Sequence, residues 1–95
     1  MQIVKCKVIN KGSLIAQVSI HIPQWHMTIH KINIFGDGQK RWLSLPSERY
    51  EDQGRSKYYP LIKFDSTAVN ERFRDSVLKA YDNHPKETQG NSNAI

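Results

Sequence analysis

Basic and aromatic side chains that could bind a nucleic acid gather around the stretch between Trp42 and Phe64. Both ends of this stretch are apolar, and Pro46 and Gly54 frame a polar insert that is too long for a tight hairpin turn. An exposed loop with buried ends is a common place for binding residues. Cations can grip phosphates while aromatic rings stack on bases. The candidate contacts are Lys40, Arg41, Arg49, Tyr50, Arg55, Lys57 and Tyr58.

Two other interpretations fit the same residues. The insert could be a solvated loop whose tyrosines are half-buried, as is common in small domains. The chain could also be a protein-interaction module that docks a partner chain through a sheet edge or an aromatic patch. Trp25 and Trp42 would be the natural anchors of such a patch.

The net charge favours an acidic partner. The chain of 95 residues carries a formal charge of +5, which suits a nucleic acid or an anionic membrane face. Residues 1–64 hold ten of the fourteen Lys and Arg but only four of the nine acids, whereas residues 65–95 hold four bases and five acids. We therefore expect the basic surface on the strands and their longest connection, and not on the C-terminal segment.

Side chains that could support catalysis or metal binding lack the companions that such chemistry needs. The expected strand pairing places His21 opposite His26, but no third ligand is near them in the sequence. Ser44 and Ser47 have no recognisable His–Asp partners, and no phosphate-binding glycine motif follows a strand. We expect no enzyme activity, no metal, no cofactor and no small-molecule substrate.

The single cysteine indicates a reducing compartment. A secreted domain this small would be expected to carry paired cysteines, so we interpret Cys6 as a small buried residue. Lys5, Lys7 and Lys11 interrupt any signal-peptide core, and no apolar run approaches membrane-spanning length. The expected location is the cytoplasm, without a membrane partner.

Alternating apolar residues predict four antiparallel strands. They cover residues 2–9, 14–22, 25–35 and 41–45, and residues 57–64 could add an edge segment, because Pro60 lacks an amide proton. A loop of two or four residues between the second and third strands places Ile20 opposite Met27 and Val18 opposite Ile29. The apolar parity changes after Ile29, which predicts a β-bulge near His30-Lys31.

One amphipathic helix is predicted after Asp65-Ser66-Thr67, any of which could cap its N-terminus. Its apolar stripe comprises Val69, Phe73, Val77, Leu78, Ala80 and Tyr81. Its bases could form a recognition helix, but three acids on the same surface nearly cancel them, which is typical of a solvated face. These bases are Arg72, Arg74 and Lys79, and the acids are Glu71, Asp75 and Asp82.

The fold class is therefore α+β. We expect one domain over residues 1–83, with a small curved antiparallel sheet of four or five strands and one C-terminal helix. His84-Pro85 ends the helix, and the polar residues 84–95 are expected to form a flexible, disordered tail.

Five blocks in order resemble the stage V sporulation protein G (SpoVG) family over about residues 3–82. They are the residues IAQVSI from Ile15, HKINI from His30, LSLPSER from Leu43, YPLI from Tyr59 and VLKAY from Val77. The most specific piece is the proline-serine-x-arginine turn, which a polar loop and a second proline follow. Two positions depart from the family pattern: Glu48 stands where a basic residue is usual, and Tyr59 where histidine is common.

The resemblance implies a bacterial cytoplasmic regulator that forms a homodimer and binds DNA and also RNA. It places Ser47 and Arg49 in the family's basic turn, where nucleic-acid contacts are expected. The departures at Glu48 and Tyr59 leave the scaffold intact but weaken any inference about a particular target sequence. The sequence leaves open whether the ligand is DNA or RNA, and single- or double-stranded.

Overall fold

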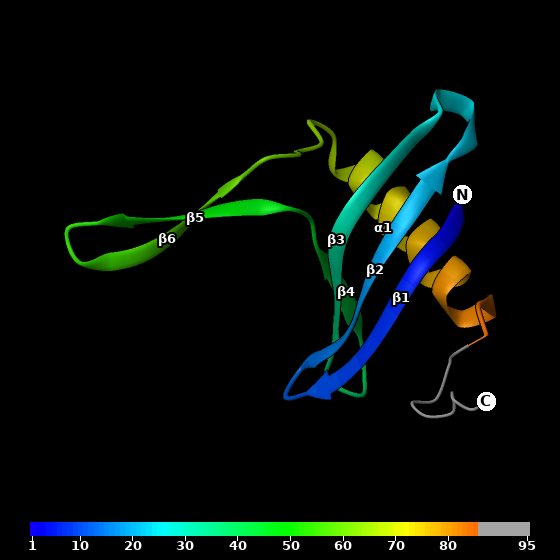
Figure 1. The fold of residues 1–95 in the computed structure, drawn as a ribbon, viewed down its shortest axis with the longest axis horizontal. Helices are drawn as coiled ribbons and strands as arrows, with labels where there is room; N and C mark the ends of the chain where they lie inside the picture. The colour runs from blue at the N-terminus through cyan, green and yellow to red at the C-terminus, as the bar shows by residue number, and fades with distance from the viewer. Residues whose placement is uncertain (86–95) are drawn as a thin grey trace.

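The computed structural model describes residues 1–85 and has two β-sheets and one long helix (Figure 1). The antiparallel four-stranded sheet contains β1 (Gln2–Lys11), β2 (Leu14–Ile22), β3 (Met27–Gly36) and β4 (Arg41–Ser44) in that order. A separate two-stranded sheet pairs β5 (Ser47–Asp52) with β6 (Arg55–Pro60). Helix α1 (Thr67–Asn83) follows and crosses one face of the larger sheet. The predicted α+β class is confirmed; residues 86–95 of the predicted tail lie outside the described residues.

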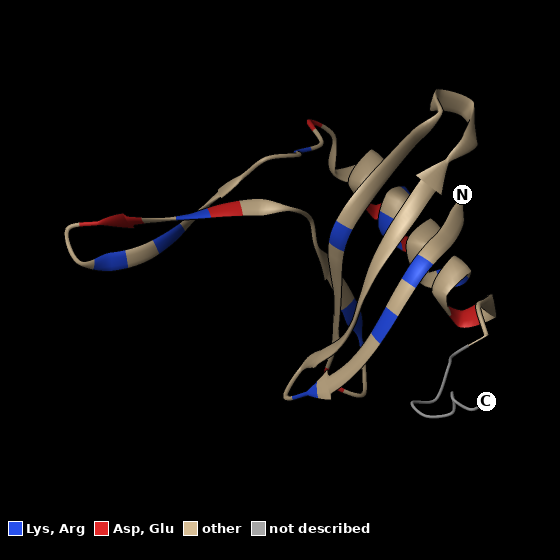
Figure 2. Cartoon of the chain, viewed as in Figure 1, with Lys and Arg blue, Asp and Glu red and all other residues tan. Residues whose placement is uncertain are grey.

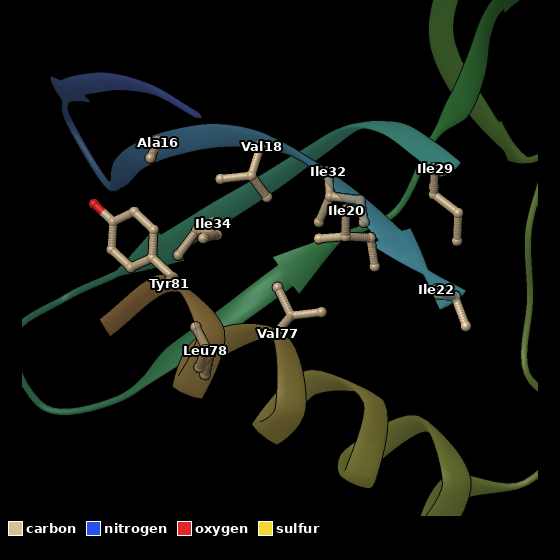
Figure 3. Packing of buried hydrophobic residues seen from close by; sticks show 10 residues of the cluster. All are labelled: Ala16, Val18, Ile20, Ile22, Ile29, Ile32, Ile34, Val77, Leu78 and Tyr81. Carbon is tan, nitrogen blue, oxygen red and sulfur yellow. The ribbon is translucent and has the colours of Figure 1, made fainter. Parts of the chain in front are cut away.

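The core lies between this sheet and the second half of α1. Period-two alternation directs the branched side chains of β2 and β3 toward the helix, as the sequence predicted. Figure 3 shows these buried side chains, which are Ala16, Val18, Ile20, Ile22, Ile29, Ile32, Ile34, Val77, Leu78 and Tyr81. Cys6 is half-buried and packs against this cluster, while Val69 at the start of the helical stripe is 37% exposed.

The register of β2 and β3 differs from the prediction. Pro23 starts a short 3-10 turn that ends at Trp25, and His26 adopts a left-handed conformation with φ 49°. The connection therefore takes four residues, so that Ile20 lies opposite Ile29 and not Met27. All the buried side chains still share one face, because the displacement is an even number of residues.

The predicted pairing of His21 with His26 is also wrong, because of the same four-residue turn. His26 belongs to the turn, and His21 lies opposite Thr28. The Nδ1 atom of His21 and the Oγ1 atom of Thr28 are 3.1 Å apart, within hydrogen-bonding distance. Among residues 1–85, no three His, Cys, Asp or Glu side chains gather in a group that could hold a metal ion.

The predicted β-bulge at His30-Lys31 is confirmed. Ile20 pairs with Ile29 and Val18 with Ile32, so the single residue Ser19 faces both His30 and Lys31. Lys31 has a φ of 63°, which lies in the left-handed region that non-glycine residues seldom adopt. The pairing of β1 with β2 shifts between Ile3 and Lys5, at the level of the same Ser19. Two irregularities therefore flank one position of β2 and bend the sheet there.

Helix α1 has a defined start. The side chain of Ser66 accepts a hydrogen bond of 3.2 Å from the amide of Val69, so Ser66 is the N-cap among the three predicted candidates. The helix ends at Asn83, immediately before His84 and Pro85. No helix in the described part of the chain is both long enough and apolar enough to cross a membrane.

Candidate nucleic-acid interface

The polar insert is a β-hairpin and not the irregular loop that the sequence predicted. Strands β5 and β6 are joined by only Gln53 and Gly54, whose φ values of 55° and 79° fit a type I′ turn. This turn twists in the same sense as the strands that it joins, so it supports a tight hairpin. We call the segment Ser47–Pro60 the arm; Figure 1 shows that it projects away from the larger sheet and the helix.

Every residue of the arm is exposed. Tyr58 and Tyr59 are 66% and 62% exposed, so the alternative of a loop with half-buried tyrosines is wrong for these two residues. The base of the arm is closed by a hydrogen bond of 3.0 Å from the amide of Leu61 to the carbonyl oxygen of Pro46. The two strands of the arm therefore leave the domain side by side, at Pro46 and Leu61, and both faces of the hairpin are exposed to solvent.

The structure divides the candidate residues of the arm between these two faces. Because side chains alternate along a strand and opposite residues share a face, Tyr50, Arg55 and Lys57 lie on one face. Arg49 and Tyr58 are opposite one another on the other face. Sequence reasoning brought these side chains together in one loop, but it did not reveal the two faces.

Neighbouring residues already contact two of the three cations in the arm. The Nζ atom of Lys57 lies 2.9 Å from Asp52, and Arg49 donates hydrogen bonds of 2.6 and 3.2 Å to the hydroxyl of Ser56. Exposed ion pairs contribute only about 0–1 kcal/mol, so a phosphate could displace Asp52. The arm contains three bases and also three acids, Glu48, Glu51 and Asp52, which makes it formally neutral.

Lys40 and Arg41 lie in a different place, at the turn between β3 and β4. Arg41 donates two hydrogen bonds to Asp82 of α1, at 2.7 and 2.9 Å, and the contact with this carboxylate raises the pKa of Arg41. Next to it, the amides of Lys40 and Gln39 donate to the carboxylate of Asp37 and lower its pKa. Arg41 thus links β4 to the helix, and Lys40 has a carboxylate beside it.

Ser47 is at the base of the arm, as the first residue of β5 and opposite Pro60. It lines a pocket of about 560 Å³ together with residues of β4 and of the segment before α1. The candidate residues therefore occupy the two faces of the arm, its base and the β3–β4 turn, and Ser47 at the base shares its pocket with Tyr58.

The excess of positive charge lies on the four-stranded sheet, and this corrects the expectation that the longest connection shares it. Residues 1–46 contain six Lys and Arg but only one acid, whereas the arm is neutral. Figure 2 shows basic residues on β1 and β3, all of them lysines, and no acidic residue on these strands. The signal was present in the sequence, because the first 36 residues contain neither Asp nor Glu.

Comparisons with known proteins identify no relative. Family models, curated proteins and solved structures all gave no match. The function must therefore be inferred from the chemistry of the arm and of the sheet.

Proposed function

We propose that this protein is a cytoplasmic, non-catalytic regulator of the SpoVG type that binds DNA or RNA through its arm. The observation that carries this proposal is a projecting hairpin, exposed along its whole length, with cations and tyrosines on both faces. An isolated two-stranded hairpin is marginally stable in water, so a long exposed arm suits a segment that binds a partner.

The dimensions and chemistry of the arm fit a nucleic acid. The major groove of B-DNA admits a two-stranded β-ribbon. Arg49 and Arg55 could contact phosphates or guanine edges, and a carboxylate such as Glu51 could accept from cytosine. On a single strand, Tyr50 and Tyr58 supply exposed rings on which bases can stack. A neutral ribbon with both kinds of charge is better suited to contacts with bases than to unspecific attraction.

The proposal includes a homodimer, which the family resemblance implies. Large apolar side chains near the base of the arm support it: Tyr59 is 62% exposed and Leu61 is 58% exposed. A second copy could cover both, because exposed apolar surface of this kind often marks a contact with another protein. Light scattering should then give twice the chain mass of 11.0 kDa.

Removing the cations of the arm tests the proposal. We expect the Arg49→Ala, Arg55→Ala, Lys57→Ala variant to lose about 5 units of log–log salt slope in fluorescence anisotropy with labelled duplex DNA, and about 4 units with a labelled single strand, because the dimer loses six phosphate contacts, three from each protomer. Its melting temperature should stay close to that of the unmodified protein, since all three side chains are exposed.

The matched control removes the same charge from the helix. Arg72→Ala, Arg74→Ala, Lys79→Ala also lowers the net charge by three, but these residues share the surface of α1 with acids, and Arg74 pairs with Asp75. The control should bind nearly as well as the unmodified protein. Equal weakening in both variants would show that only total charge matters and would overturn the role of the arm.

A protein-interaction module is the second candidate. It is favoured by an apolar groove of about 410 Å³ between the β2–β3 turn and α1, beside Trp25, which is 66% exposed. Such a complex would tolerate salt and would be indifferent to the three substitutions in the arm. The same titrations, repeated at two salt concentrations, therefore separate the two candidates.

A further inference from the structure

The face of the four-stranded sheet that points away from α1 is polar, whereas the face toward α1 is apolar and buried. Three cross-strand contacts run along β2 and β3: Ser19 with His30 at 2.9 Å, Gln17 with Asn33 at 3.0 Å, and His21 with Thr28. These contacts hold the polar side chains of the outer face in place. The result is an ordered polar surface on the side that no helix covers (Figure 1).

Lysines lie on both sides of this polar row. Lys5 and Lys7 of β1 face Ser19 and Gln17, and Lys31 of β3 lies in the bulge opposite Ser19. At strand spacings, the backbones of Lys5 and Lys7 are about 7 Å apart, and those of Lys5 and Lys31 about 10 Å apart. All three lysines, with Ser19 and His30, line one pocket of about 380 Å³.

The charge of these lysines is not neutralised within the described chain. Lys5, Lys7 and Lys31 form no ion pair among residues 1–85. No strand of this sheet carries an acidic residue. The arm differs in this respect, because its bases and acids are equal in number. A group that binds at the outer face would therefore meet three ammonium groups and no carboxylate from the sheet.

We infer that this outer face is a second contact surface, which binds the phosphodiester backbone of the nucleic acid. The inference rests on the proposed function. In it, the arm and the outer face of the sheet both contact the nucleic acid. The sheet, which carries no acidic residue, adds phosphate contacts to those of the arm cations, and the arm also supplies contacts with bases. Backbone contacts of this kind position a protein on its ligand without reading the sequence.

The backbone at Lys31 allows an unusually clean test. With a φ of 63°, this position would suit glycine better than lysine. Lys31→Gly therefore removes a cation while it relieves the backbone, and the melting temperature should stay the same or rise. If Lys31 contacts a phosphate, the salt slope of binding should nevertheless fall by about 2, because the dimer loses one contact from each protomer. A merely structural role would predict a loss of stability instead.

The full test combines Lys5→Ala, Lys7→Ala and Lys31→Gly in one variant. Loss of three phosphate contacts from each protomer removes six from the dimer and lowers the salt slope on duplex DNA by about 5, which corresponds to about 10⁵-fold weaker binding at 0.1 M salt if the affinities converge at 1 M. The probe is a labelled mixed-sequence duplex, with single-stranded DNA and RNA of the same sequence alongside. The helix variant with Arg72, Arg74 and Lys79 replaced by Ala is again the charge-matched control.

The outcomes separate the two claims. The inference is supported if the variant with Lys5, Lys7 and Lys31 replaced binds more weakly and with a smaller salt slope, while the helix control still binds. Equal binding by the sheet variant and the unmodified protein overturns the inference while the proposed function stands. An unmodified protein that binds none of the three probes overturns the proposed function itself. Circular dichroism melts of each variant show that any loss of binding occurs in folded protein.

Discussion

Excising the arm should abolish high-affinity nucleic-acid binding and leave the rest of the domain folded. Pro46 and Leu61 are already joined by a hydrogen bond of 3.0 Å, so an Asn-Gly pair in place of Ser47–Pro60 closes an ordinary two-residue turn. No buried side chain is lost, since every arm residue is exposed. We expect the free energy of unfolding to change by less than about 1 kcal/mol.

The excision also leaves the net charge at +5, because the arm contains equal numbers of bases and acids. A loss of binding therefore cannot be attributed to a change in total charge. Three lost phosphate contacts per protomer, six in the dimer, correspond to about 10⁵-fold weaker binding at 0.1 M salt, and each lost stacking contact costs about 1–3 kcal/mol more. Unchanged affinity of the shortened chain, measured by fluorescence anisotropy, would refute the arm as a contact surface.

Ile32→Ala should be the most destabilising of the single substitutions considered. Ile32 is fully buried opposite Val18, directly beside the bulge. Truncating such a side chain leaves a cavity and costs about 2–5 kcal/mol. A chain of 95 residues has a free energy of unfolding of roughly 5–14 kcal/mol, so this is a large share of the total. Urea titration followed by circular dichroism measures it.

The control is Val4→Ala, because Val4 is also a β-branched residue of the sheet but is 54% exposed. It should cost less than about 1 kcal/mol. If Ile32→Ala cost no more than Val4→Ala, the packing of α1 on this face of the sheet would be wrong.

The elements with a buried face could be predicted from the sequence. Apolar residues alternate along β2 from Ala16 to Ile22, and the change of apolar parity between Ile29 and Ile32 of β3 indicated the bulge. The register was missed by two residues, because Pro23 opens a 3-10 turn that removes Trp25 from the strand. Alternation defines which face is buried, but it does not define the length of a turn.

The arm could not be recognised from hydrophobic alternation, since neither of its faces is buried. A residue such as Glu51 is compatible with a loop or an exposed strand, so the segment resembled an irregular insert. The available signal was Gly54 at the second position of a two-residue turn, with tyrosines on both sides. The separation of Arg49 from Lys57 on opposite faces follows only once this turn is known.

The sequence predicted positive charge on the strands, but it did not single out the outer face of the sheet as a contact surface. Lys5 and Lys31 lie 26 positions apart in the sequence, and only the pairing of β1 and β3 with β2 at Ser19 brings them to the same level. The absence of acids from the first 36 residues was visible, but the total charge of a segment does not define a surface.

The salt dependence of binding by the unmodified protein tests the central claim most directly. The measurement is a fluorescence-anisotropy titration of duplex DNA, single-stranded DNA and RNA at several salt concentrations between 50 and 200 mM. A dimer that neutralises about three phosphates per protomer should give a log–log slope of roughly −5 on duplex DNA, or steeper if both surfaces bind. A slope near zero with all three probes, or no binding at the lowest salt concentration, would contradict the account.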